Sequence, residues 1–253
     1  MSANHPGTPA TGTLLGIWAH PDDEAFLSAG LMALARKAGE RVVVATATRG
    51  ESGTTDPTRW PLEQLAQVRE QELARSLAVV GVSEHRWLGH RDGALAGVRR
   101  AAAVAQTAAL LEEVRPDTVV TFGPEGMTGH EDHRTISDWV TRAWHETGRT
   151  CRLWYATLTP GFHRTWGGLN DEIGLWFPGA SPPVTRPDEL AARVECTGRL
   201  SDLKHAALRA HASQTDGLVR TVGEDRFRRW WAVESFVSAQ LATVQKEASH
   251  ASR

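Results

Sequence analysis

The sequence predicts an α/β protein built on a doubly wound, mostly parallel sheet with helices on both faces. Short apolar runs alternate with longer segments whose apolar residues recur at helical spacing, which is the pattern of consecutive β–α–β units. The runs at 13–19 and 117–122 lead directly into polar loops, as buried parallel strands do. Because crossovers between parallel strands are right-handed, a doubly wound layer is the expected arrangement.

The expected elements follow one another in a regular order. The first helix stops at Gly39, and the third is closed by Pro116. A segment rich in Gly, Pro and Trp, 159–190, is expected to be an insertion that covers a pocket. Strands are expected at 13–19, 41–48, 84–89, 117–122 and 151–158, and helices at 24–40, 62–80, 97–116 and 197–214.

Length and composition favour one globular unit. Of 253 residues, 41% are hydrophobic, and the net charge is −2, so the chain lacks the electrostatic footprint of a nucleic-acid surface. We expect a disordered lead over 1–12 and a single domain over 13–253 with an elaborated C-terminal part. Cys151 and Cys196 do not make a disulfide framework. Without a signal peptide or an apolar run of about 20 residues, a cytoplasmic location is expected. The oligomeric state cannot be predicted.

Polar residues follow three of the predicted strands at the point where each strand ends. The three loops read His-Pro-Asp-Asp-Glu at 20–24, Arg-Gly-Glu-Ser-Gly at 49–53 and Gly-His-Glu-Asp-His at 129–133. Ligands of open α/β sheets bind beyond the carboxyl ends of the strands. Parallel strands end on one edge of the sheet, so the first and third loops can converge there.

The first and third loops together predict a metal site. A catalytic zinc ion takes three nitrogen or oxygen ligands and keeps one position open for water. His20 and Asp23 come from one tight turn, and either His130 or His133 can complete the triad. The remaining histidine can steady an oxyanion, and Asp22 can accept a proton from the attacking water. Either motif alone would be explained by chance; both, each directly after a predicted strand, indicate a metal site.

These motifs also resemble those of a known family. Ala-His-Pro-Asp-Asp-Glu after the first strand, Thr-Arg-Gly-Glu-Ser-Gly after the second and Gly-His-Glu-Asp-His-Arg after the later strand look like the signature of the PIG-L (LmbE-like) family. The likeness covers roughly 14–215, in the right order. Members are metal-dependent N-deacetylases that mostly act on N-acetylglucosaminyl substrates, so the resemblance implies a Rossmann-like fold and this chemistry.

The resemblance assigns roles at the expected metal site. It implies that His20, Asp23 and His133 bind zinc, and ferrous iron is an alternative because sites with two histidines and one carboxylate accept both metals. Asp22 is then the general base, and His130 is the electrophilic partner of the carbonyl.

The resemblance further implies contacts with substrate. Arg69 matches a family arginine that touches substrate, Asp92 lies at a family position near the sugar, and His211 belongs to a late His-x-Ser-Gln motif that supports the site or faces the substrate. Two positions depart from the family pattern. Glu131 stands where many relatives carry proline, and Thr128 stands where some sugar deacetylases carry a tyrosine that helps the oxyanion.

The expected function is hydrolysis of the N-acetyl group of an N-acetylglucosaminyl-type or related small molecule. Two alternatives stay open: an amidase of the same family that cleaves thiol-sugar conjugates, and a carbohydrate-binding descendant without catalysis. A nucleotide-binding module is disfavoured because no Gly-x-Gly-x-x-Gly turn follows the first strand. The aglycone, the role of Glu24 and that of the Trp-rich segment 160–185 are not assigned. The basic run 226–231 is expected to be a helix face that packs its Trp residues inward.

Overall fold

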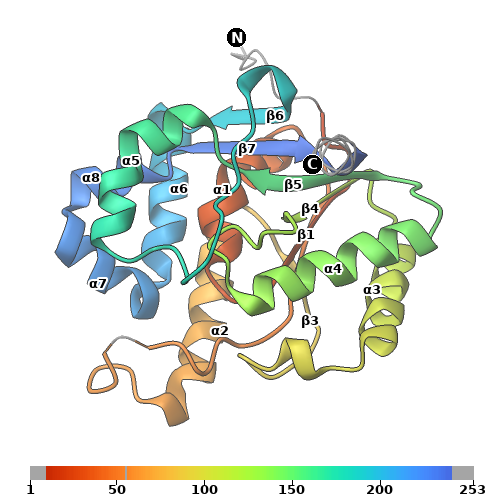
Figure 1. The fold of residues 1–253 in the computed structure, drawn as a ribbon, viewed down its shortest axis with the longest axis horizontal. Helices are drawn as coiled ribbons and strands as arrows, with labels where there is room; N and C mark the ends of the chain where they lie inside the picture. Colours follow the sequence, from red (N-terminus) through yellow and green to blue (C-terminus); the bar gives the residue numbers. More distant parts are fainter. Residues whose placement is uncertain (1–9, 55, 241–253) are drawn as a thin grey trace.

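The described residues of the computed structural model, 10–54 and 56–240, form one seven-stranded sheet covered by helices (Figure 1). The strand order is β3-β2-β1-β4-β5-β7-β6. The strands are β1 (Leu14–Trp18), β2 (Val42–Thr46), β3 (Glu84–Trp87), β4 (Thr118–Phe122), β5 (Arg152–Thr157), β6 (Leu190–Glu195) and β7 (Val233–Ser238).

The sheet is parallel from β3 across to β5, and its far edge is antiparallel. β1 pairs in parallel with both β2 and β4. β7 pairs antiparallel with β5 and with β6. Because the chain moves outward from β1 to β3 and then returns to β4, the direction of winding reverses between β1 and β4. This is the switch point at which doubly wound sheets bind ligands.

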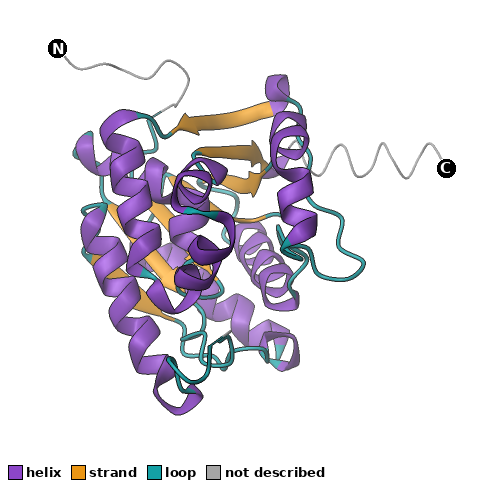
Figure 2. Ribbon diagram, turned by 90° about the vertical axis from the view of Figure 1, so that its left-hand side faces the viewer, coloured by secondary structure: helices purple, strands orange, loops and turns teal. Residues whose placement is uncertain are grey.

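Helices cover both faces of the sheet. α3 packs against α4 on one face, and α6 packs against α1 and α2 on the other (Figure 1). Figure 2 shows the strands lying between these two layers. The helices are α1 (Asp23–Lys37), α2 (Leu62–Val79), α3 (Arg100–Val114), α4 (Glu131–Glu146), α5 (Pro160–Glu172), α6 (Gly198–Ala210), α7 (Ala212–Val222) and α8 (Glu224–Trp230), with 3₁₀ turns η1 (Leu95–Gly97) and η2 (Pro187–Glu189).

The centre of the sheet is fully buried. Every residue of β1, β2 and β4 is buried, which explains why these strands read as continuous apolar runs rather than alternating ones. At the ends of β1 and β4 the rings of Trp18 and Phe122 meet edge to face, 5.0 Å apart. The switch point therefore stands on a rigid apolar base.

The predicted α/β class, the parallel strands and the helices up to β5 are confirmed. The C-terminal part differs from the prediction. The segment 159–190 contains α5, which the glycine-rich sequence hid, although Thr159 caps the helix and Pro160 occupies its first turn. The expected helix 197–214 is two helices, because His211 leaves the helical conformation between them. β6 and β7 were not predicted, and α8 extends the helix expected in the basic run 226–231 back to Glu224.

Three smaller expectations concern the ends of the chain. Trp230 and Trp231 of the basic run are buried, as expected for a helix face that packs inward. Of the predicted lead, residues 1–9 lie outside the described residues, while Thr11 is buried and bonds the Glu40 carboxylate. The single domain over 13–253 stays a prediction. Among the described helices, none combines the length and the apolar character needed to cross a membrane.

Candidate metal centre

The turn after β1 is held in an unusual backbone conformation. Asp22 has φ 116°, a region that residues other than glycine rarely adopt. Its N–H donates to Glu24 Oε2 at 2.9 Å, and the carbonyl of Pro21 accepts from Arg69 Nη2 at 2.5 Å. The backbone N–H of His20 donates to Asp23 Oδ2 at 2.8 Å. These bonds fix the turn so that its polar side chains face the switch point.

The start of α4 supplies two more imidazoles. His130 caps the helix, and its Nδ1 accepts the backbone N–H of Asp132 at 3.1 Å, so a neutral ring carries its proton on Nε2. His133 lies one turn further and stacks on Phe122 with centroids 4.0 Å apart. Its Nδ1 is 3.1 Å from the Gly126 carbonyl. Donation there leaves the Nε2 lone pair of His133 free to bind a cation.

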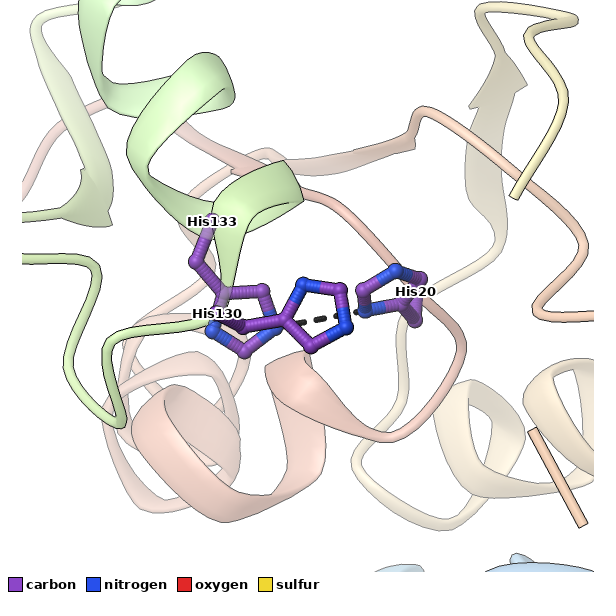
Figure 3. Close-up of side chains that lie close together, drawn as sticks. All are labelled: His20, His130 and His133. Carbon is purple, nitrogen blue, oxygen red and sulfur yellow. Dashed lines mark hydrogen bonds between the residues drawn. The ribbon is translucent and has the colours of Figure 1, made fainter. Parts of the chain in front are cut away.

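Three side chains that can bind a metal converge between the two loops. His133 Nε2 lies 3.2 Å from His20 Nδ1 and 3.3 Å from Asp23 Oδ1, and His20 Nδ1 lies 3.6 Å from Asp23 Oδ2. Figure 3 shows His20 and His133 facing each other, with the ring of His130 beside them. Two imidazole nitrogens and one carboxylate are a ligand set that zinc takes in catalytic sites, so these residues fit a bound zinc ion.

Two carboxylates orient His20 from behind. Its Nε2 lies 3.0 Å from Asp92 Oδ1 and 3.4 Å from Asp132 Oδ2. Donation from Nε2 turns the Nδ1 lone pair toward the cation position, as carboxylates behind metal-binding histidines do. Burial lowers the pKa of His20, but the hydrogen bonds to Asp132 and Asp92 outweigh it and raise the pKa to about 10. A cation at Nδ1 would take the place of that proton.

Two other groups of ligand atoms lie within 4.8 Å of one another: His20, His130 and His133, and His20, Asp92 and Asp132. In the second group, Asp132 already accepts the N–H groups of Gly93 and Leu95. This group is therefore satisfied as a hydrogen-bond network. In the group of His20, His130 and His133, the Nδ1 of His130 accepts the backbone N–H of Asp132. A neutral His130 ring therefore presents an N–H at Nε2 rather than a lone pair. The set of His20, Asp23 and His133 is the one whose free lone pairs converge.

Asp22 lies beside this set with its carboxylate at the cavity. Arg69 Nη2 approaches Asp22 Oδ2 at 3.4 Å. Burial raises the pKa of Asp22, and the positive charges of Arg69 and His211 only partly offset it. A carboxylate with a raised pKa is suited to exchange protons near neutral pH.

Glu24, to which the sequence assigned no role, is hydrogen-bonded to the turn after β1. Its Oε2 accepts the N–H of Asp22, while Oε1 accepts from Ser76 Oγ at 3.0 Å and lies 2.8 Å from His211 Nε2. Glu24 and His211 are fully buried. Burial alone would lower the pKa of His211, but Glu24 outweighs it and raises that pKa, so the two groups form a buried ion pair.

The structure brings some predicted substrate residues to the cavity and not others. Arg69 lines it. His211 does not line it, because its ring is enclosed against Glu24. Asp92 is buried against His20 and accepts the N–H of Ser52 at 2.9 Å. His211 thus contacts the turn and Asp92 a candidate metal ligand, and their predicted contact with substrate stays a prediction.

The loop after β2 is shaped to admit Arg69. Gly50 has φ 65°, and a Cβ there would lie 2.3 Å from the Arg69 guanidinium carbon. Its carbonyl accepts from Arg69 Nη1 at 2.9 Å. Further along the loop, Glu51 Oε1 accepts the N–H of Asp92 at 3.0 Å. This second motif thus positions the groups that stand behind Asp22 and His20.

A cavity of about 790 Å³ opens from the metal centre. Its polar end is formed by Asp22, Arg69 and the candidate metal ligands, and the rest of its lining includes apolar residues from α1 and from the chain after β5. A neighbouring cavity of about 430 Å³ shares His130 and Phe177 with it. Sequence reasoning missed Asp132, although it stands between the two histidines of the third motif, and it missed Phe177, for which no motif gives a signal.

Comparison with known proteins identifies relatives over most of the chain. Residues 15–144 match the family model described as PIG-L: GlcNAc-PI de-N-acetylase. A 1D-myo-inositol 2-acetamido-2-deoxy-alpha-D-glucopyranoside deacetylase from Saccharomonospora viridis is 33% identical over 242 residues, which cover 85% of this chain and 87% of that protein. A protein of the same name from Acidothermus cellulolyticus is 30% identical and covers 89% of this chain and 88% of its own length.

Solved structures share the fold. The N,N'-diacetylchitobiose deacetylase of Pyrococcus horikoshii has a TM-score of 0.59 at 22% identity and covers 90% of this chain and 84% of its own. The zinc-inhibited form of teicoplanin deacetylase has a TM-score of 0.59 at 18% identity, covering 90% and 98%. The 4-carboxy-2-hydroxymuconate hydratase of Pseudomonas putida KT2440 reaches 0.61 at 16% identity, covering 90% and 96%. A fold shared by deacetylases and a hydratase does not by itself determine the reaction.

Proposed function

This chain is a deacetylase that belongs to the PIG-L family, and from that premise we propose that it uses zinc to remove the acetyl group from a small 2-acetamido-2-deoxy-glucopyranoside. One observation carries the proposal: the His-Pro-Asp-Asp turn after β1 and the Gly-His-Glu-Asp-His segment before α4 meet at the switch point of the sheet. Their convergence joins a set of metal-ligand atoms to an adjacent carboxylate with a raised pKa.

The relatives support an acetamido sugar as the substrate class. Proteins named as deacetylases of 1D-myo-inositol 2-acetamido-2-deoxy-alpha-D-glucopyranoside match more than four fifths of this chain and of their own length. We infer an N-acetylated glucosamine unit as the shared part of the substrate. The inositol part is a property of those relatives.

We propose His20, Asp23 and His133 as the residues that hold the metal. Zinc, when bound, acts as a Lewis acid that polarises the amide carbonyl and lowers the pKa of water toward about 7. Ferrous iron suits the same donor set. Reconstitution with each metal distinguishes them.

Protons are moved by the chain's own residues. Asp22 takes a proton from the attacking water as the bond to the acetyl carbon forms. The Nε2–H of His130 donates a hydrogen bond to the oxyanion that develops on the former carbonyl oxygen. Burial lowers the pKa of His130. Because its Nδ1 accepts the Asp132 N–H, the neutral ring carries its proton on Nε2 and can donate there. Asp22 then gives its proton to the departing amine, and acetate and a free amino sugar result.

Arg69 is proposed as the residue that joins catalysis to substrate binding. It lines the cavity, and its charge faces Asp22. Its buried Nε–H has no acceptor among the described residues, whereas both Nη groups are engaged. The predicted cytoplasmic location stays a prediction.

The proposal is tested by acetate release. The purified protein is stripped with a chelator, reconstituted with zinc or ferrous iron, and incubated with methyl 2-acetamido-2-deoxy-glucopyranoside. We expect release only after a metal is restored. Faster cleavage of a thiol-sugar conjugate amide would favour the amidase alternative. Binding of the sugar without release of acetate, by a protein with its metal restored, would favour the carbohydrate-binding alternative and contradict the proposal.

A further inference from the structure

We propose that the amino-sugar substrate of this enzyme carries an apolar group, which binds against the apolar wall of the cavity that holds the candidate metal centre. The inference rests on the proposed function and specifies its substrate class. We call this surface the C-terminal wall. It consists of Ile173, Leu175 and Phe177 from the segment after α5, Leu218 of α7, and Trp230 and Trp231 at the end of α8.

The C-terminal wall belongs to the same cavity as the metal centre. Phe26 and Leu27, which lie one helical turn beyond Asp22 and Asp23 in α1, also line the cavity. The ring of Phe26 lies 5.8 Å from that of Trp231. An apolar surface thus begins directly beside the reacting groups and continues to α8. A substituent on a sugar bound at the metal centre would meet this surface.

Three hydrogen-bond donors on this side of the cavity are used within the protein, whereas the buried Nε1 of Trp231 has no acceptor among the described residues. Gln214 Nε2 donates to the Gly53 carbonyl at 3.0 Å, and Thr221 Oγ1 donates to the Gly217 carbonyl at 3.0 Å. Trp230 Nε1 donates to Asn170 Oδ1 at 2.9 Å. The hydroxyl groups of a polyol would give up their bonds to water and find few donors free to replace them, which weakens binding.

Charge on this side is confined to the rim. Arg220 lines the cavity but is exposed. Apolar residues of the wall, in contrast, remain partly open to solvent: Phe177 is 47% exposed with its ring edge-on to His130, 4.9 Å away, and Leu218 is partly buried. A bound apolar group would cover these side chains, and this burial favours its binding over that of a polar ring.

The test compares glycosides that share one acetamido sugar. Wild-type enzyme with its metal restored is assayed for acetate release from the methyl, hexyl and inositol glycosides. We expect kcat/KM for the hexyl glycoside to exceed that for the inositol glycoside by about tenfold or more, since each methylene group in an apolar pocket contributes about tenfold or more. An inositol glycoside that is turned over as well as the hexyl glycoside, or better, overturns the inference.

A longer acyl group is the other source of the same apolar chemistry. The methyl glycoside with an N-hexanoyl group is therefore assayed beside the hexyl glycoside with an N-acetyl group. Preference for either one over the inositol glycoside supports the inference, and the preferred one shows whether the wall binds the aglycone or the acyl chain.

A matched pair of variants tests the wall itself. Leu218→Asn should reduce the ratio of kcat/KM between the hexyl and methyl glycosides toward one. Val184→Asn is the control, because Val184 is 60% exposed and does not line the cavity. It should leave the ratio as in the wild type. Equal ratios in both variants would contradict the inference, provided that both melt at the temperature of the wild type.

Failure of the proposed function gives a result that differs from failure of the inference about the wall. In that case no glycoside releases acetate, and binding alone is measured by the fluorescence of the tryptophans in the wall. Tighter binding of the hexyl than of the methyl or inositol glycoside would still support the wall as an apolar site. Equal binding of all three would overturn it.

Discussion

The metal edge, formed by the loops after β1, β2 and β4, and the C-terminal wall are built in opposite ways. At the edge, polar side chains are bonded to one another or to the loop backbone: Asp92 and Asp132 hold His20, and Glu24 holds the backbone of Asp22. The wall presents apolar side chains, and the donors of Trp230 and of the neighbouring Thr221 are bonded within the protein. The hydrogen bonds at the edge thus fix the orientation of its reacting groups. The wall offers apolar surface, which does not require a bound group to take one orientation. We propose the first region for the reaction and the second for the choice of substrate.

The largest effect is expected at the reacting carboxylate. Asp22→Asn keeps the size of the side chain but removes the proton acceptor, so kcat for acetate release should fall by about 10²–10⁴-fold. Metal content should stay at the wild-type level, because Asp22 is not among the converging ligands. Steady-state kinetics and metal analysis on the same sample give both numbers. Activity close to that of the wild type would remove Asp22 from the mechanism.

A substitution of Glu24, which is hydrogen-bonded to the turn of the metal edge, should lower the stability of the protein. Glu24→Gln leaves the His211 imidazole buried without its counter-charge, and breaking a buried pair in this way costs about 3–5 kcal/mol in free energy of unfolding. Urea denaturation measures it. The double variant Glu24→Gln/His211→Asn removes both charges and should recover part of the loss. If the single variant is as stable as the wild type, the ion pair does not hold the turn.

A weaker effect is expected from pH at the sheet edge next to the metal loops. Burial lowers the pKa of His85, on β3, to about 4 from its ordinary 6.5. Between these values the unfolded chain binds a proton that the folded chain does not. Stability should therefore fall by about 1–3 kcal/mol as the pH drops from 6.5 to 4. In His85→Gln this part of the pH dependence should vanish. An unchanged slope in denaturation measured at several pH values would contradict the assignment.

The smallest effect is expected for a phenylalanine of the wall, compared with one of the edge. Phe177→Ala should change the free energy of unfolding by no more than about 0.5 kcal/mol, because the ring is half exposed. Phe122→Ala should cost about 3–5 kcal/mol, since that ring is fully buried and stacks on His133. Thermal or urea unfolding measures both changes in free energy. Similar changes for the two substitutions would contradict the structural difference between the regions.

The same difference explains what the sequence could predict. Strands buried on both faces read as unbroken apolar runs, and a polar loop directly after such a strand must lie at one edge of a parallel sheet. The convergence of His20 with His133 could therefore be predicted from order and spacing. Spacing alone could not decide whether His130 or His133 is the third candidate ligand. The choice depends on which nitrogen of His130 accepts the backbone N–H at the start of α4.

The C-terminal part escaped prediction for physical reasons. β6 and β7 pair antiparallel beyond β5, and polar residues interrupt both strands, Glu234 and Ser235 among the buried ones of β7, so neither reads as an unbroken apolar run. α5 carries Gly167 and Gly168 inside its helix, which lowers its helix propensity. The role of Glu24 depends on His211, 187 residues away in sequence. Contacts of that range leave no local pattern.

Anomalous diffraction at the zinc absorption edge, from crystals grown with zinc, tests the central claim most directly. We expect one strong peak bounded by His20 Nδ1, His133 Nε2 and the Asp23 carboxylate, with Asp22 beside it and unligated. A peak on the opposite side of the His20 ring, among Nε2, Asp92 and Asp132, would contradict the account. The metal site would then be the group of His20, Asp92 and Asp132, and Asp22 would not lie beside the metal.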